Sequence, residues 1–579
     1  MFSFTKKKSH VYFNNHLAAI ITFTFVYILL TWPLAIHFNE GMLGSFVGDG
    51  WEEVEQFWWF KHTLIDQHTS PFFDPLMFYP EGWNVITGSH SPTLMIPTIP
   101  LTIIFGPVGA FNIAMFLSFL FAALGSYLLI VHLTQKRFAG LIAGIVFAFT
   151  MSRLLRIGGH FNTAMGSAWI PWVFLCLERG RTSQNHRWRW FAAASACYAG
   201  SVLSYFYFVY IIAVPIALYF IIEIWQSRTN LSSVKQRIFE GLLTFGVAAV
   251  LVAPFALMAF AARNQMDVPG YSLEYTASRG ISPDRLFIPN RYHPLWGNWF
   301  KQFFPDQGEK TFVFLGLTAI VLAGIAVLKK IHSRSTFYFL LVLVTLLIGM
   351  GPYLQWNAQF VTLPISISGL ENPRIPLPGI LLFLYAPMFN VIRVWARFGL
   401  VTSFAVATLA GFAASHFQKR PRWGLPVVLI LLFLVILESF GHPFGYVSAN
   451  EMVREVDVWL EQQPESTAVL ELPLSVRQNG SLLYSRMLHG QPIASGYATA
   501  LSQQYHQNAF VYSKFPNQET VNILQNIGVS YLLYTVKNET QFKNEVEPAI
   551  NELLNLDYIQ ILRGHPGQTV YIYRVKEPE

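Results

Sequence analysis

Charged residues are scarce in this sequence. Asp, Glu, Lys and Arg together make up 12% of its 579 residues, whereas a soluble protein carries about a quarter of such residues. Hydrophobic residues make up 53% of the chain and aromatic residues 16%. This surplus of apolar side chains needs lipid to cover it. The composition therefore excludes an ordinary soluble protein and predicts an integral membrane protein.

Cysteine is nearly absent as well. The chain has two, Cys176 and Cys197, and both fall in apolar runs, so no disulfide framework is visible. The residues from 442 to the end contain none, which suits a bacterial or archaeal envelope domain that folds on its own core. A CxxC pair and a P-loop glycine pattern are also missing, which argues against a zinc site and ATP-driven chemistry.

The sequence contains eleven apolar runs that we interpret as membrane-spanning helices. The first, residues 17–36, has no charged residue over a length that crosses a hydrocarbon core about 30 Å thick. This run is too long for the apolar part of a signal peptide, and no small-residue cleavage site follows it, so we expect a helix that stays in the protein. The other runs are residues 109–132, 138–152, 164–178, 190–204, 206–225, 238–260, 311–328, 336–353, 398–416 and 424–441.

Basic residues set the expected orientation. If the N-terminus is cytoplasmic, the short segments on that side hold 18 of the 39 Lys and Arg residues, which is the positive-inside pattern of plasma-membrane proteins. This distribution explains the net charge of +7 without a nucleic-acid partner. We therefore expect outer loops at 37–108, 261–310 and 354–397, and an extracytoplasmic C-terminal region at 442–579.

Two apolar stretches do not fit this orientation as full spans. Residues 92–106 and 376–391 each contain three prolines, and counting either as a span would move a basic segment to the outside. We interpret both as re-entrant or interfacial pieces on the outer side, because non-helical backbone at membrane depth is tolerated only against protein or a water-filled cavity.

The first outer loop combines acids with tryptophans. Apolar residues recur at helical spacing from Trp51 to Ile65, with acids on the other side, which predicts an amphipathic helix in the membrane interface with its tryptophans at headgroup level. Asp49 precedes this helix between two glycines, which let the backbone approach a ligand closely. An Asp at this position could instead serve only as the helix N-cap, and both interpretations stay open at this stage.

Several short motifs together resemble one superfamily. Gly48-Asp49-Gly50, the aromatic helix after it and the segment Phe78-Tyr79-Pro80-Glu81-Gly82 look like the GT-C superfamily of membrane glycosyltransferases, and in particular like large bacterial membrane proteins within or near it. Later segments that resemble the same group begin at Arg156, Trp169, Pro289, Phe389, Leu470, His489 and Phe515. The resemblance covers nearly the whole chain, although each motif is short.

This resemblance implies a function. GT-C enzymes transfer a sugar from a polyprenyl-phosphate donor to a glycan, lipid or protein acceptor on the outer side of the membrane, usually with inversion. Asp49 matches the catalytic acid of their first loop, and a carboxylate can take the proton of the acceptor hydroxyl. In many members a second acid is separated from the first by one residue. In this chain Gly50 and Trp51 follow Asp49, and the next acids are Glu52 and Glu53. A divalent cation (Mg²⁺ or Mn²⁺) with Asp49 as a ligand is compatible with the resemblance, but no ligand set is visible in the sequence.

Other polar residues are candidates for binding the donor or the acceptor. Arg393 and Arg397 are four residues apart, so they would share one face of a helix, and a planar guanidinium suits phosphate. Their alternative role is to anchor lipid headgroups. Glu52 and Glu53, together with His160, Arg291 and His293, are further candidates, and for a loop histidine a structural role is the common alternative.

The C-terminal region has a different pattern. Helical patterns near 449–462, 517–527 and 540–555 alternate with strand-like runs at 468–474, 529–536 and 569–575. This alternation predicts a small α/β domain at 442–579 that follows a GT-C-like helical membrane domain at 1–441.

Two other functions stay open. A transporter or flippase for a lipid-linked glycan would keep polar residues inside its spans and often contain internal repeats, neither of which is evident here. A scaffold could retain the enzyme fold without catalysis.

Overall fold

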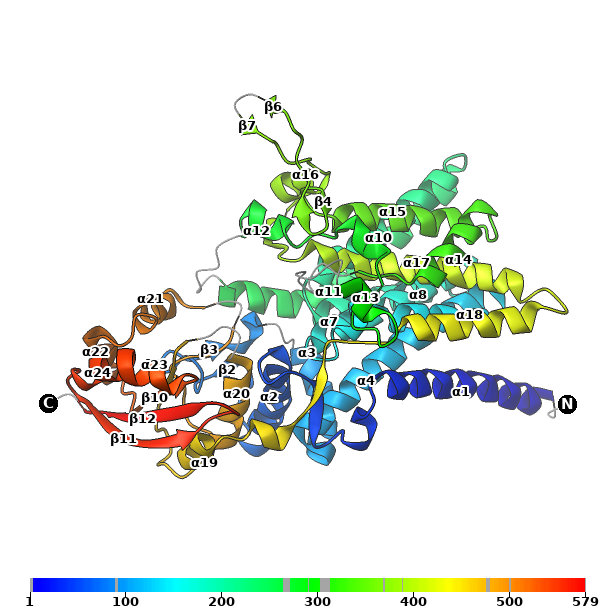
Figure 1. Ribbon diagram of the computed structural model, residues 1–579. Helices are drawn as coiled ribbons and strands as arrows, with labels where there is room; N and C mark the ends of the chain where they lie inside the picture. The colour runs from blue at the N-terminus through cyan, green and yellow to red at the C-terminus, as the bar shows by residue number, and fades with distance from the viewer. Residues whose placement is uncertain are drawn as a thin grey trace.

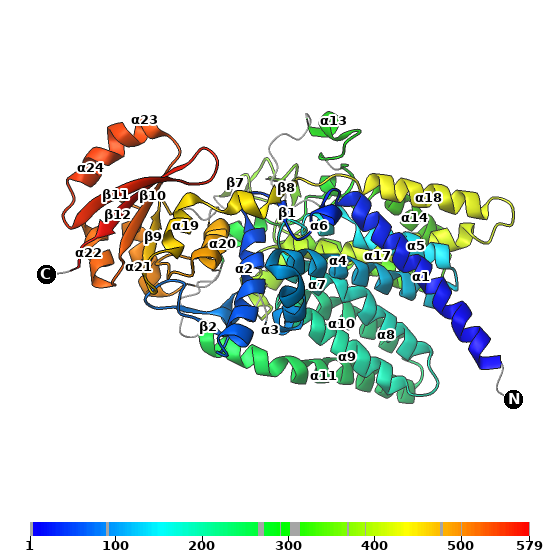
Figure 2. The same cartoon turned by 90° about the horizontal axis from the view of Figure 1, so that it is seen from below.

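The protein forms a helical bundle with a smaller region that contains a β-sheet at one end, as the computed structural model shows (Figure 1). The N-terminus lies at the end of the bundle opposite to this region (Figures 1 and 2). The structure describes residues 4–88, 92–263, 271–289, 291–301, 313–367, 370–387, 389–474, 479–498 and 501–577.

Long helices occupy the predicted apolar runs, with α7 and α8 together covering the run 164–178. They are α1 (Phe4–Leu30), α4 (Ile99–Thr134), α5 (Arg137–Ala148), α7 (Phe161–Ala168), α8 (Ile170–Thr182), α9 (Arg187–Ser204), α10 (Phe208–Gln226), α11 (Leu231–Arg263), α14 (Leu317–Leu328), α15 (Ser335–Gly349), α17 (Gly399–Phe417) and α18 (Gly424–Glu438). Among the described residues, four segments are long and apolar enough to cross a membrane, namely Pro92–Thr134, Phe208–Gln226, Leu231–Arg263 and Trp395–Phe417. Shorter apolar helices accompany them, and eleven crossings stay a prediction.

Helix α17 forms the centre of the bundle. Its apolar stretch is completely buried, and α5, α14 and α15 pack against it. Small residues such as Ala407, Ala410 and Gly411 let neighbouring helices approach closely, which is how helices associate where lipid removes the hydrophobic driving force. Helix α11, by contrast, leaves most of its apolar surface exposed, as expected of a helix that faces lipid.

Charged side chains join the helix ends on the side of the predicted cytoplasmic loops. Arg334 lies 2.7 Å from carboxylate oxygens of both Glu178 and Glu223. Arg237 of α11 continues this network, because it lies 3.5 Å from Glu223 and 3.0 Å from Glu240. All three glutamates are buried, and a buried charge is tolerated only when it is paired. The network therefore fixes the ends of α8, α10 and α11 relative to one another.

The two proline-containing stretches are partly helical. The first comprises α3 (Pro92–Met95), η4 (Ile96–Thr98) and the start of α4, which kinks at Gly106 with φ 72°. Only glycine adopts this backbone conformation readily, and Pro107 follows it. The second contains the short helix α16 (Gly379–Tyr385). Their depth in the membrane stays a prediction.

The prediction of an interfacial helix in the first loop is wrong. Helix α2 (Asp49–Lys61) is buried on both faces, because it packs against α4 on one side and α20 (Asn479–His489) on the other (Figure 2). Trp51 has no exposed surface, so it contacts protein rather than lipid headgroups. The acidic face of α2 meets protein rather than water.

Arg486 supplies the counter-charge for this acidic face. Its guanidinium forms ion pairs with Glu55 of α2 and with Asp74 of β2 (Phe73–Asp74), and the three side chains are almost completely buried. The ring of Trp59 lies 5.5 Å from the guanidinium carbon. The C-terminal region is therefore joined to the first outer loop by a buried charge cluster.

The C-terminal sheet has four strands in the order β11-β12-β10-β9. Strand β9 (Val469–Leu472) is parallel to β10 (Tyr531–Val536), which pairs antiparallel with β12 (Thr569–Val575). The three predicted strands are thus confirmed, and β11 (Leu556–Arg563) was not predicted. The helices of this region are α19 (Glu455–Glu461), α20, α21 (Gln503–Tyr512), α22 (Gln518–Asn526), α23 (Glu539–Gln541) and α24 (Glu547–Asn551).

A second pair of β-strands joins the segment after the first long helix of the bundle to the segment after the last one. Strand β1 (Gly41–Gly44) follows α1 and pairs antiparallel with β8 (Gly445–Ser448), which follows α18. A Cβ atom on Gly41 would lie 2.3 Å from the carbonyl oxygen of Val447, so the close approach requires glycine. The segments after the first and last long helices of the bundle are thereby held side by side.

Candidate functional site

Asp49 lies where three distant parts of the chain meet. It is the first residue of α2, and Gly48 occupies the N-cap position without a side chain, so the interpretation of Asp49 as only an N-cap is wrong. One carboxylate oxygen, Oδ1, accepts a hydrogen bond of 2.9 Å from the hydroxyl of Tyr497. The other, Oδ2, lies 3.2 Å from Nε2 of His160. The Asp49 side chain keeps 38% of its surface exposed, so a substrate can reach it.

Glycines allow the three segments around Asp49 to approach one another closely. A Cβ atom on Gly159, which has φ 132°, would lie 2.8 Å from the backbone nitrogen of Gly50. A Cβ atom on Gly480, at the start of α20, would lie 2.1 Å from the carbonyl oxygen of Gly48. The loop before α7 and the start of α20 can therefore contact the start of α2 only because these residues lack side chains.

The predicted arginines lie close to this cluster, although not on one helix as expected. The chain forms two short turns, η7 (Phe389–Val391) and η8 (Trp395–Phe398), which are separated by an extended Val394. Because the backbone changes direction there, Arg393 and Arg397 do not share a helix face. Arg397 is buried and donates a hydrogen bond of 2.9 Å from Nη1 to the hydroxyl of Tyr205. Its guanidinium carbon lies 5.0 Å from the centroid of the Tyr205 ring.

Both arginines have an N–H group without a hydrogen-bond partner among the described residues. The Nε atoms of Arg393 and Arg397 are buried and have no hydrogen-bond partner within the described part of the chain. The positive charge of Arg397 lowers the pKa of His160, and that of Arg393 acts on Tyr497. The two cations are thus near enough to the carboxylate cluster to influence it electrostatically.

Partial burial and nearby charges act on the groups around Asp49. The His160 side chain stays 35% exposed, and its partial loss of solvent and the nearby charge of Arg156 lower its pKa against the opposing effect of Asp49. Burial, and then the charge of Asp49, raise the pKa of Tyr497, which keeps its hydroxyl a donor.

The neighbouring glutamates are less accessible. Both carboxylate oxygens of Glu53 lie 2.8 Å from the backbone N–H of Phe161, the first residue of α7. Glu53 therefore orients the helix that begins just after His160. Glu52 is buried, and burial, together with the charges of the surrounding acids, raises its pKa well above the usual range. Their predicted role in binding donor or acceptor stays untested.

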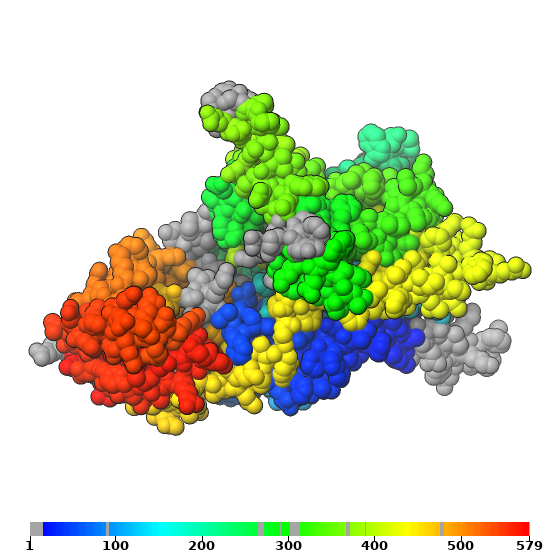
Figure 3. Space-filling model, viewed as in Figure 1, coloured from blue at the N-terminus to red at the C-terminus, as the bar shows by residue number. Residues whose placement is uncertain are grey.

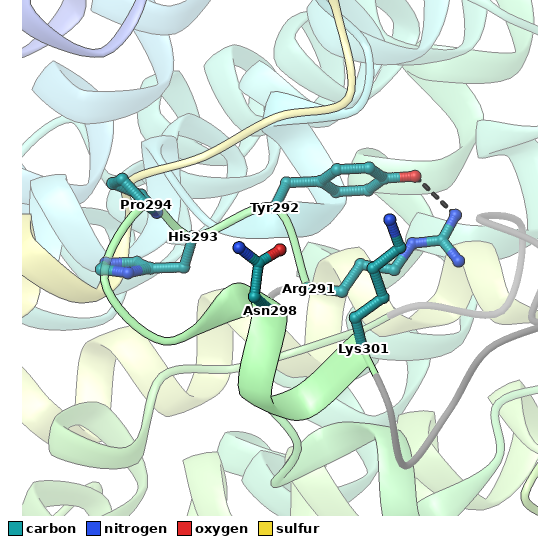
Figure 4. Close-up of a pocket in the computed structure, with 6 residues that line it drawn as sticks. All are labelled: Arg291, Tyr292, His293, Pro294, Asn298 and Lys301. Carbon is teal, nitrogen blue, oxygen red and sulfur yellow. Dashed lines mark hydrogen bonds between the residues drawn. The ribbon is translucent and has the colours of Figure 1, made fainter.

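Arg291 and His293 line a different cavity. Its volume is about 390 Å³, and Lys301 and Asn298 also line it (Figure 4). The ring of His293 stacks on Trp296 with 3.5 Å between ring centroids, and its Nε2 lies 2.8 Å from the carbonyl oxygen of Leu437. His293 thus has the contacts of a structural residue. None of the contacts described for Asp49 involves this cavity.

No metal-binding cluster is evident within the described ranges. They contain no group of three or more His, Cys, Asp or Glu side chains that could hold an ion. Asp49 and His160 form only a pair, so the protein donors at this position do not fit a complete metal site, and the chemistry proposed below involves no metal.

Comparisons with known proteins identify the fold. Neither protein-family models nor curated proteins match the sequence. Among solved structures, arabinofuranosyltransferase AftD from Mycobacteria aligns with a TM-score of 0.56 and 11% identity, over 97% of this chain and 40% of AftD. The oligosaccharyltransferase of Archaeoglobus fulgidus aligns with a TM-score of 0.47 and 14% identity, over 92% of this chain and 71% of its own.

ArnT from Cupriavidus metallidurans, solved with undecaprenyl phosphate, aligns with a TM-score of 0.43 and 10% identity, over 97% of this chain and 99% of ArnT. These three proteins are GT-C membrane glycosyltransferases. The chain has the GT-C fold, as the alignment with AftD shows, and the predicted resemblance is confirmed at that level.

Proposed function

We propose that this protein transfers a sugar from a polyprenyl-phosphate donor to an acceptor hydroxyl at the outer face of a bacterial or archaeal plasma membrane, with inversion. The observation that carries the proposal is the accessible carboxylate of Asp49, which accepts a hydrogen bond from Tyr497, lies beside His160 and has two arginines in its surroundings. The GT-C fold and the predicted outer location of this cluster support it.

Each residue has a role in this reaction. Asp49 takes the proton of the acceptor hydroxyl while the hydroxyl oxygen forms a bond to the anomeric carbon of the sugar. The bond from that carbon to the phosphate oxygen breaks, and its electron pair leaves with the phosphate. Arg393 and Arg397 stabilise the negative charge that develops there, because charge-assisted hydrogen bonds from guanidinium groups to phosphate are strong.

Binding and turnover of a polyprenyl-phosphate sugar test this function. The purified protein in lipid nanodiscs is expected to bind this donor and to release polyprenyl phosphate when an acceptor is supplied. A scaffold would show neither binding nor turnover. A transporter in proteoliposomes would move the intact donor across the bilayer without releasing the sugar. Either of these results would contradict the proposal.

Replacement of Tyr497 by phenylalanine tests the hydrogen bond to Asp49. A hydroxyl that donates to a carboxylate holds it in one orientation, and a hydrogen bond to a charged group contributes about 1.5–3 kcal/mol. We expect turnover to fall about tenfold, which corresponds to about 1.4 kcal/mol, with donor affinity and thermal stability close to those of the wild type. A parallel loss of thermal stability would indicate only a structural role, and unchanged turnover would show that this hydrogen bond does not serve catalysis.

Tyr505→Phe provides a matched control, because Tyr505 is also a buried tyrosine of the C-terminal region, and it packs on Phe78 with 4.6 Å between ring centroids. It has no described contact with Asp49. Its turnover should match that of the wild type.

A further inference from the structure

A folded arm extends sideways from the outer end of α15. We define the outer arm as residues 353–387, of which 353–367 and 370–387 are described. It contains the strand pairs β4 (Gln355–Trp356) with β5 (Gln359–Phe360) and β6 (Ser366–Ile367) with β7 (Leu370–Glu371), followed by α16. Figures 1 and 3 show the arm projecting away from the bundle. Its shape comes from regular β-pairing.

Backbone hydrogen bonds hold the arm together, but it has almost no core. Ile375 N–H donates to the carbonyl of Val361 at 3.0 Å, and Leu354 N–H to that of Ile375 at 3.0 Å. Between residues 356 and 387 of the arm, Gly379 is the only buried residue among those whose side chains the structure describes. The apolar side chains of the arm must therefore be covered by something outside the chain.

Large apolar side chains are exposed along its length. Five of them have exposures between 48% and 79%. They are Trp356, Ile365, Leu381, Leu384 and Tyr385. Such a concentration of exposed apolar residues marks an interaction surface.

Charge is almost absent from the arm. Its sequence contains only Glu371 and Arg374. Arg374 is already engaged, because it lies 2.6 Å from Glu274 of α12 (Leu273–Ala277) and 4.3 Å from the ring centroid of Phe360. A partner that binds through charge complementarity therefore has little to recognise. Trp and Tyr on an apolar surface are typical of the boundary between lipid tails and headgroups.

The exposed surface of α15 leads to the arm. Leu340, Leu343 and Leu347 are exposed by 37%, 45% and 40%, and their spacing places them on one face of this apolar helix. The helix ends at Gly349, and the arm begins four residues later. The arm thus directly follows a helix whose exposed face is apolar, as expected of a helix that faces lipid.

We propose that the outer arm lies in the outer membrane interface and binds the lipid bilayer, with α16 and Trp356 at the level of the upper acyl chains. Lipid is favoured over a second copy of the chain because the arm directly follows α15, whose exposed face is apolar, and because ionic groups are almost absent. This inference concerns how the protein sits in the membrane, so it does not depend on the proposed sugar transfer.

Depth-dependent fluorescence quenching tests the arm. A fluorescent NBD label is attached at Leu384→Cys in a Cys176→Ala/Cys197→Ala background, and the full chain is placed in nanodiscs of phosphatidylcholine and phosphatidylglycerol. We expect doxyl groups near the top of the acyl chains to remove most of the emission and aqueous iodide to remove little. Tyr385→Cys offers a second position if Leu384→Cys does not fold.

Phe510→Cys is the matched control, because Phe510 is an exposed apolar residue in α21 with 63% exposure against 57% for Leu384. Its label should be quenched by iodide and not by doxyl lipid. The proposal would be overturned if iodide quenched the label at residue 384, because the arm would then face water. It would equally be overturned if neither quencher acted and cross-linking through the arm joined two copies.

Discussion

Asp49→Asn is expected to reduce sugar transfer by two to four orders of magnitude, since a general base typically contributes about 10²-fold to 10⁴-fold to a rate. An asparagine cannot take the proton of the acceptor hydroxyl. It retains an oxygen that can accept the hydrogen bond from Tyr497, so the fold should not change. The measurement is turnover of a polyprenyl-phosphate sugar in nanodiscs, together with donor affinity, which should be nearly unchanged.

Asp66→Asn is the matched control for this variant. Asp66 lies in the same outer loop, its side chain is 37% exposed against 38% for Asp49, and it pairs with Lys61 at 2.7 Å rather than with the cluster. The same chemical change there should leave turnover within about twofold of the wild type, because surface ion pairs contribute little. Full activity in Asp49→Asn would remove the base from the mechanism.

Arg486→Met is expected to destabilise the protein by about 3–5 kcal/mol, which is the usual cost of leaving buried charges without their partner. The variant leaves Glu55 and Asp74 facing each other in a buried site. Burial already raises the pKa of Glu55, and the positive charge of Arg486 opposes this. Thermal or denaturant unfolding of the purified protein measures the loss.

Two further variants make this result specific. Arg563→Met removes an arginine that is 87% exposed and lies 3.6 Å from Glu455, so its effect should stay below about 1 kcal/mol. Arg486→Met combined with Glu55→Gln and Asp74→Asn removes all three charges and should recover much of the stability. If Arg486→Met were no less stable than Arg563→Met, the buried cluster would not hold the C-terminal region to the first loop.

The sequence predicts the helices of this fold well, because a helix in lipid must be apolar along its length. Each predicted apolar run overlaps a helix of the structure for the same reason. Orientation and the number of membrane crossings rest on the distribution of Lys and Arg and stay predictions. Asp49 could be singled out because glycines flank it, and the structure indeed brings it together with His160.

The partners of Asp49 could not be predicted in the same way. Tyr497 is 448 residues away along the chain, and Arg486 is 431 residues from Glu55. Such pairings leave no local periodicity or spacing. The burial of α2 could not be predicted for the same reason. An acidic helix face suggests contact with water, and Arg486, which pairs with Glu55 on this face, is distant in the sequence.

The pairing of β1 with β8 has a consequence for how the chain can be divided. Cutting after residue 441 would remove the only strand that pairs with Gly41–Gly44 among the described residues, and it would uncover the face of α2 that α20 covers. A truncated membrane portion should therefore aggregate or be degraded, whereas two separately expressed fragments should assemble when they are made together. We therefore expect the boundary that composition places at residue 442 to separate two kinds of sequence, but not two independent folding units.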